Sequence, residues 1–168
     1  QQDVVEQSAV YAQKESGERA TAQKSVWHFS GFSTDTFQID EGRQKLVKKE
    51  DYYELSIARN HPPSVLTEAV KETYLAPELM LQVKHPQIQT KAQALAKELE
   101  TDAMKADAVI KWVYDALDKK PVVSLPNALQ ILQTKEGDCN EHATLAVALL
   151  RAMEIPARIA SGLAYLEG

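Results

Sequence analysis

The sequence predicts an α+β fold, with a small β-rich extension in front of a helical core. Two observations carry this prediction: aromatic and β-branched residues dominate residues 26–59, and a 3.6-residue apolar period appears after Pro86. The chain has 168 residues, of which 44% are hydrophobic and 26% charged. This composition is ordinary for a globular protein, and the length suffices to bury a core without metal or disulfide support.

The N-terminal half divides into three predicted segments. Residues 1–25 are rich in Gln, Glu, Ser, Lys and Ala, which is typical of a linker or a marginal helix. In residues 26–59 the runs VWHF, TFQI and YYELSI, separated by SGFSTD and DEGRQ, predict a small antiparallel sheet. Residues 62–85 contain three prolines and favour a connecting segment. We therefore expect a β-rich extension and connecting segment over residues 26–85 and a second domain over residues 86–168.

Two amphipathic helices are predicted next. The first follows Pro86 and places four apolar residues on one face, namely Ile88, Ala92, Leu95 and Leu99. The second has Asp102 as its N-cap and ends at or shortly before Pro121. Its apolar stripe consists of Val109, Trp112, Val113 and Ala116.

A short third helix and an apolar fourth helix follow. Pro126 stands where a first-turn proline belongs, and Gly137 would end the short helix that it opens. Residues 143–153 are apolar almost all round, so the fourth helix should pass through the middle of the domain. After Pro156 the run ARIASGLAYL indicates a strand.

The single cysteine, Cys139, stands at the start of the fourth helix. Asp138 and Glu141 have the spacing of a capping box, which makes Asp138 the N-cap and Cys139 the first helical residue. Unpaired N–H groups and the dipole at a helix N-terminus favour negative charge, and they stabilise a thiolate near neutral pH. We therefore interpret Cys139 as a nucleophile, against the plainer interpretation of a buried packing residue.

Two neighbours of Cys139 admit more than one role. His142 lies three residues further along the same helix face, so it could be a base, a supporting residue behind the nucleophile or a structural residue. Asp138 is better explained as a cap than as a member of a catalytic triad. Cys139 and His142 also form half of a zinc-ligand pattern, but the sequence holds no second Cys/His pair. Neither a metal nor another cofactor is predicted.

Around this cysteine the sequence resembles the transglutaminase-like superfamily. Gly137, Cys139 and Ala143 match the signature G-x-C-x-x-x-A, and the run IPAR together with Gly162 extends the similarity. The resemblance covers residues 86–168. It implies a papain-like/transglutaminase-like core, in which helices and a central nucleophile helix precede the start of an antiparallel sheet. It also implies a Cys-His-Asp triad whose His and Asp come from later strands, beyond the end of this chain.

The implied function is that of a bacterial cysteine enzyme, either a peptidase or amidase or a protein acyltransferase, acting on peptide or protein amides. The Cys139 thiolate would attack the carbonyl carbon to give a thioester, which water or an amine resolves. The backbone N–H of Cys139 would be one oxyanion donor, while Gln133 suits a second by its offset alone. Without the later His and Asp, the chain is expected to be inactive or nearly so. The alternative is a non-catalytic peptide-binding or assembly module.

One position departs from the family pattern. A glycine usually precedes IPAR at the end of the helix, whereas this chain has Glu154, which tolerates a positive φ poorly. We therefore expect a locally altered helix end, with no consequence for the nucleophile.

Charge and hydropathy exclude several partners. A net charge of −5 leaves no basic stripe for nucleic acid, and the longest apolar run, residues 143–150, is too short to span a membrane. The chain begins with Gln1 and carries no leader, which is typical of a processed or excised protein. The compartment stays unknown, although family habit favours an extracytoplasmic location, periplasmic or secreted. Absent strands would expose an apolar seam that could support a homodimer.

Overall fold

The computed structural model describes residues 22–31, 42–60, 65–120 and 126–162. The predictions made for residues 1–21, the run TFQI, Pro121 and the end of ARIASGLAYL lie outside these residues. The chain forms two compact units, Gln1–Val65 and Leu66–Gly168.

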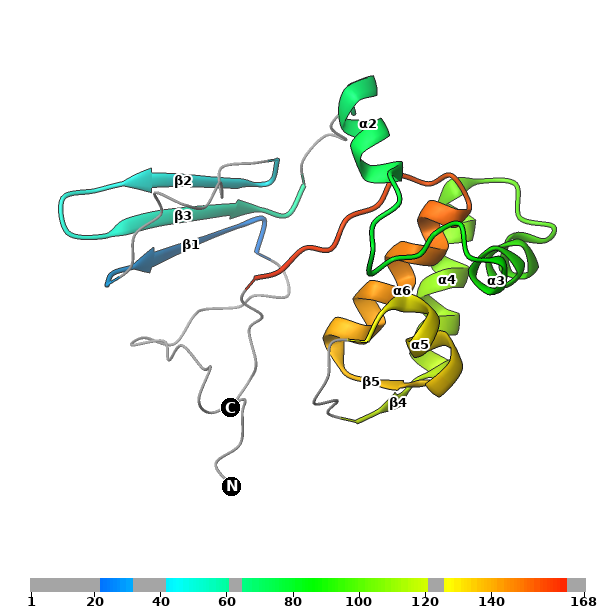
Figure 1. Cartoon of the computed structure of the whole chain (residues 1–168). Helices are drawn as coiled ribbons and strands as arrows, with labels where there is room; N and C mark the ends of the chain where they lie inside the picture. The colour runs from blue at the N-terminus through cyan, green and yellow to red at the C-terminus, as the bar shows by residue number, and fades with distance from the viewer. Residues whose placement is uncertain (1–21, 32–41, 61–64, 121–125, 163–168) are drawn as a thin grey trace. The chain divides into compact units, whose positions relative to one another are not determined.

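The first unit contains a three-stranded antiparallel sheet of order β1-β3-β2 (Figure 1). The strands are β1 (Lys24–Phe29), β2 (Gln44–Lys48) and β3 (Tyr53–Ala58). Every second residue of β1 is partly buried, as expected for a strand with one covered face. The predicted antiparallel sheet is confirmed for β1 and β3.

The sequence analysis missed β2. Its run, QKLVK, has only two apolar residues between charged or polar neighbours, so it carries no strand signal of its own. Pairing with the central strand supplies the missing stabilisation, because Leu46 lies opposite Leu55 and Val47 opposite Glu54.

The second unit is built around one central helix. Its helices are α2 (Glu68–Leu75), α3 (Pro86–Ala96), α4 (Asp102–Ala116), α5 (Ala128–Thr134) and α6 (Cys139–Ala152). α6 contacts α3, α4 and α5 (Figure 1). Two short strands, β4 (Asp118–Lys119) and β5 (Glu136–Gly137), pair in parallel just before α6 begins. The α+β class is therefore confirmed.

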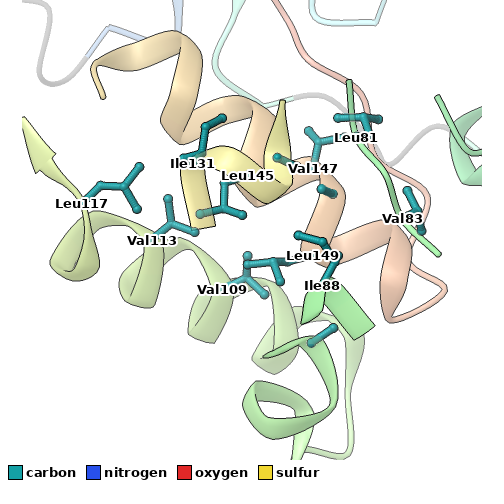
Figure 2. Packing of buried hydrophobic residues seen from close by; sticks show 13 residues of the cluster. Leu81, Val83, Ile88, Val109, Val113, Leu117, Ile131, Leu145, Val147 and Leu149 are labelled. Carbon is teal, nitrogen blue, oxygen red and sulfur yellow. The ribbon is translucent and has the colours of Figure 1, made fainter. Parts of the chain in front are cut away.

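The core of this unit forms where α6 meets its neighbours. Leu145 and Leu149 of α6 are fully buried and lie against Val109 and Val113 of α4 (Figure 2). The same cluster includes Ile88 and Ala92 of α3 and Ile131 of α5, all with no exposed surface. Burying one such aliphatic side chain contributes roughly 1.5–3 kcal/mol, so this cluster supplies much of the stability of the unit. The predicted apolar stripe of α4 is confirmed, and so is that of α3 except for Leu99.

Two predicted helix starts are corrected by one residue or more. The N-cap of α4 is Thr101, whose Oγ1 accepts a hydrogen bond from the Met104 N–H at 3.2 Å, and Asp102 is the first helical residue. Pro126 precedes the N-cap of α5 instead of lying in its first turn, because the Asn127 side chain caps that helix. Both Thr and Asn are strong N-caps, and sequence alone did not distinguish them from the adjacent candidates.

Two helix ends, those of α3 and α5, also differ from expectation, whereas α4 ends before Pro121 as predicted. α3 ends at Ala96, so Leu99 lies beyond it, and α4 ends at Ala116 before β4. α5 ends at Thr134, and its C-cap, Lys135, adopts the left-handed conformation with φ of 55°. Gly137 therefore belongs to β5 and does not break that helix.

Residues 66–85 form part of the second unit, with α2 at their centre. α2 was missed because three prolines dominate the surrounding sequence, yet Thr67 caps it by accepting from the Val70 N–H at 3.4 Å. Leu81 and Val83 enter the core, with 2% and 6% of their surface exposed. The chain after α6 returns to α2, since the Ala157 N–H donates to the Tyr74 carbonyl at 3.1 Å.

The strand predicted after Pro156 is not present in the described residues, which reach residue 162. Ala157 is hydrogen-bonded to α2 instead of to a neighbouring strand. A strand requires a partner strand for its backbone groups, and local β-propensity alone does not provide one.

A buried arginine joins three segments of this unit. Arg151 near the end of α6 has 6% of its surface exposed. Its Nε donates to the Ala157 carbonyl at 2.8 Å, and its Nη1 donates to the Ala76 carbonyl and to Glu78 Oε1, both at 2.6 Å. One guanidinium therefore pairs two backbone carbonyls and one carboxylate, which offsets the cost of burying its charge.

We predict that Arg151→Ala lowers the free energy of unfolding by about 3 kcal/mol, because two carbonyls and one carboxylate lose their donor. The midpoint of urea unfolding measures the effect. Lys71→Ala is the control, since Lys71 forms an exposed ion pair with Glu68 worth at most about 0.5 kcal/mol. Equal midpoints for the two variants would contradict the anchoring role of Arg151.

Glu154 completes the end of α6 in the left-handed conformation, with φ of 62°. The Glu154 N–H donates to the Arg151 carbonyl at 3.1 Å, and the Ile155 N–H donates to the Leu150 carbonyl at 3.0 Å. These two bonds form a Schellman motif. The helix end therefore has the geometry that glycine favours. Glu154 adopts it at the conformational cost of a positive φ.

We predict that Glu154→Gly stabilises the protein by about 0.5–1 kcal/mol, because glycine adopts positive φ without a Cβ penalty. Thermal unfolding measures the gain. Glu72→Gly, the same change inside α2, should instead destabilise by about 1 kcal/mol. A loss of stability in Glu154→Gly would contradict this account of the helix end.

Candidate active site

Cys139 is the first residue of α6, and its side chain is exposed. Asp138 is the N-cap: its Oδ1 accepts from the Asn140 N–H at 3.1 Å, and its side chain also accepts from the Glu141 N–H. Glu141 returns the contact, since its Oε2 accepts from the Asp138 N–H at 2.9 Å. The predicted capping box is confirmed, while the role of Cys139 as a nucleophile stays a prediction.

The capping glutamate is itself part of the packing. Glu141 has 4% of its surface exposed and lies directly over Gly137. A Cβ at residue 137 would come within 2.2 Å of the Glu141 Cβ and 2.6 Å of its Cγ. Glycine is therefore required at this position for reasons of space, because any side chain would push Glu141 away from the backbone that it caps.

The backbone before Cys139 is held by β4 and β5. The Asp118 N–H donates to the Lys135 carbonyl at 2.8 Å, and the Lys120 N–H donates to the Gly137 carbonyl at 3.3 Å. At the surface, Lys120 Nζ lies 2.9 Å from Glu136 Oε1 and 3.5 Å from Asp118 Oδ2. The hydrogen bond and charge of Glu136, followed by those of Asp118, raise the pKa of Lys120 above its usual value. Sequence patterns gave no signal for this bridge.

The His142 side chain contacts Asp138, the N-cap residue of α6. Its Nδ1 lies 2.6 Å from the Asp138 carbonyl oxygen, which also accepts the His142 backbone N–H at 3.0 Å. Its Nε2 is buried and has no hydrogen-bond partner among the residues described. The structure therefore joins His142 to Asp138 at the end of α6 where Cys139 is the first residue.

Gln133 was a candidate for the second oxyanion donor because of its offset from Cys139, but its side chain contacts another helix. Its Nε2 donates to Gln87 Oε1 at 3.1 Å, which joins α5 to α3. In contrast, the Cys139 N–H donates to no acceptor in the described part of the chain, as expected for the first amide of a helix. Acyl-transfer chemistry can use a free N–H next to an exposed thiol. When the thiol attacks a carbonyl carbon, the N–H can donate a hydrogen bond to the carbonyl oxygen as that oxygen becomes negatively charged.

The described residues include neither a cluster of metal ligands nor a membrane-spanning helix. They contain no group of three or more His, Cys, Asp or Glu side chains placed to hold a metal ion. Within the same residues, no helix is long and apolar enough to cross a bilayer.

The family model of the transglutaminase-like superfamily matches residues 89–168, which include α4, α5 and α6. This part of the chain belongs to that superfamily. The match covers the capping box, Cys139 and the helices that bury α6. The superfamily predicted from the signature around Cys139 is therefore confirmed.

Two solved structures are similar to the chain. The first is described as a "putative cysteine protease" from Cytophaga hutchinsonii and is 16% identical, with a TM-score of 0.49; the match covers 79% of this chain and 53% of that one. The second is described as a "putative protease" from Parabacteroides distasonis and is 14% identical, with a TM-score of 0.40; the match covers 79% of this chain and 30% of that one. This chain thus spans about half or less of the proteins that it matches. No curated protein matches the chain.

We predict that Gly137→Ala destabilises the protein by about 1–3 kcal/mol, because the new methyl group overlaps Glu141. Urea unfolding measures the loss. Gly162→Ala is the matched control, since a Cβ there meets nothing within 4 Å, and it should change stability by less than about 1 kcal/mol.

A double variant identifies the cause of the loss. If the clash with Glu141 is responsible, adding Glu141→Gly to Gly137→Ala should cost less than Glu141→Gly costs alone, because only glycine removes the Cβ that the new methyl group meets. Strict additivity of the two changes would argue against the clash.

Proposed function

We propose that this protein acts as a transglutaminase-like cysteine enzyme, with Cys139 as the nucleophile that forms an acyl-thioester from a peptide or protein amide. The observation that carries the proposal is an exposed thiol beside a backbone N–H that donates to no acceptor in the described residues, both at the N-terminus of α6. Membership of the transglutaminase-like superfamily supports the same chemistry.

In the proposed reaction, the thiolate of Cys139 attacks the carbonyl carbon and forms a C–S bond, while the carbonyl π electrons move to oxygen. The Cys139 N–H donates to that oxyanion. The tetrahedral intermediate then expels the amine, which must leave with a proton, and the thioester remains. Water or a second amine attacks the thioester and returns the thiol, which gives hydrolysis or cross-linking respectively.

The proton-transfer groups of this proposal follow from the family resemblance. It places the general base and its carboxylate partner on strands after α6, so we propose a His and an Asp beyond residue 168 in these roles. His142 and Asp138 are then supporting residues at the nucleophile. Dimerisation and an extracytoplasmic location stay predictions.

One half of this reaction can be tested without a general acid. 4-Nitrophenyl acetate releases 4-nitrophenolate, which needs no proton to leave, so acetylation requires only a thiolate and an oxyanion donor. Iodoacetamide reports the thiolate alone, because alkylation develops no oxyanion. Cys139 is the only cysteine, so both reagents address a single thiol.

We predict that the native chain is alkylated roughly two to five times faster at pH 7 than the urea-unfolded chain, because Cys139 lies at the N-terminus of α6, where free backbone N–H groups favour negative charge. Acetylation should be accelerated by a further factor of about ten or more, because the native chain also presents the Cys139 N–H. Stopped-flow absorbance measures nitrophenolate release, and mass spectrometry locates the acetyl group.

Cys139→Ala is the control for acetylation of other side chains. If native and unfolded chains react equally fast with both reagents, the enzymatic proposal is wrong. The result would then favour the peptide-binding or assembly module of the same fold.

A further inference from the structure

His142 makes a contact that its position in the sequence does not reveal. Its Nδ1 lies 2.6 Å from the carbonyl oxygen of Asp138, four residues earlier. A carbonyl oxygen can only accept a hydrogen bond, so Nδ1 must carry the proton and donate it. The same oxygen accepts the His142 backbone N–H at 3.0 Å, so both of its lone pairs are engaged by one residue.

The other ring nitrogen supports one protonation state. Nε2 is buried, and no group in the described residues, the Cys139 thiol included, forms a hydrogen bond with it. A proton there would bury an unpaired donor on a charged ring, which costs more than leaving a bare acceptor. The neutral ring with its proton on Nδ1 is therefore the form that fits the site.

This arrangement argues against His142 as the base for the thiol. Nδ1 is occupied by the Asp138 carbonyl, and Nε2 is buried while Cys139 is exposed. Neither nitrogen is placed to take a proton from the sulfur. The effect of His142 must instead pass through the carbonyl that it holds.

That carbonyl belongs to the same peptide group as the Cys139 N–H. A peptide group is planar and trans, so its C=O and N–H point in opposite directions and turn together. We propose that His142 is a positioning residue for the oxyanion donor: by donating from Nδ1 to the Asp138 carbonyl, it fixes the Asp138–Cys139 peptide plane and thereby the direction of the Cys139 N–H. This inference rests on the proposed function of Cys139.

Two reagents separate a positioning role from a base. His142→Ala removes the hydrogen bond from Nδ1 to the Asp138 carbonyl, so the Cys139 N–H is no longer held in one direction. Acetylation by 4-nitrophenyl acetate should therefore slow roughly tenfold, as expected for a misdirected oxyanion donor. Alkylation by iodoacetamide should change by less than about twofold, because it forms no oxyanion. A base acting on the thiol would slow both reactions together.

Conservative variants supply a matched pair. The amide of His142→Asn lies near the Nδ1 position and can donate to the Asp138 carbonyl, whereas the amide of His142→Gln lies near the Nε2 position. Acetylation should therefore be restored to within about threefold of the parent in the Asn variant and stay slow in the Gln variant. His28→Ala, at an exposed histidine of the first unit, controls for loss of an imidazole and should leave both rates unchanged.

Nitrogen NMR of the parent protein tests the inference without any variant. The expected signature is a neutral ring with a proton on Nδ1 and none on Nε2. A proton on Nε2, equal acetylation rates for the parent and His142→Ala, or a parallel fall in alkylation would each overturn the positioning role while leaving Cys139 as the proposed nucleophile. If the parent chain is not acetylated at Cys139 at all, the proposed function falls and the positioning role falls with it.

Discussion

The burial of α6 is the constraint on which the second unit depends. Its apolar faces contact α3, α4 and α5, and it can be buried only if the polar groups at its two ends find partners. At the first turn the capping box of Asp138 and Glu141 supplies these partners, and at the last turn the N–H groups of Glu154 and Ile155 supply them. Glu141 and Arg151, the charged residues near the two ends, are themselves almost fully buried. The helix is thereby fixed in position at the end that carries Cys139.

Much of this fold could be predicted because its main signals are local. The apolar periods of α3, α4 and α6 repeat over at least three turns each, and such patterns persist in any tertiary context. α2, β2 and the β4–β5 bridge are short, and their stability comes from partners distant in the sequence. Boundaries failed where two capping residues are adjacent, as with Thr101 and Asp102, because either residue satisfies the same amides.

In the candidate site, too, the features that could be predicted are those whose partners are close in the sequence. The capping box of Asp138 and Glu141 could be predicted because its partners lie three residues apart in one turn. The steric reason for Gly137 could not, since it depends on the path of β5 beneath Glu141. The hydrogen bond from His142 to the Asp138 carbonyl was equally hidden, because it depends on one rotamer of the imidazole. Sequence therefore singled out Cys139, while the structure supplies the contacts that surround it.

The β4–β5 bridge also has a consequence for dynamics. It connects the end of α4 to the residues that precede Cys139, and so it closes the chain into a loop around α5. In the described residues a two-pair ladder and the Lys120–Glu136 ion pair hold that closure, whereas α6 is held by the whole core. Local opening of the loop should therefore require less free energy than global unfolding, and amide hydrogens near Gly137 should exchange before those in the middle of α6. The end of the helix that carries Cys139 would then fluctuate on its own timescale, with the core as a rigid support.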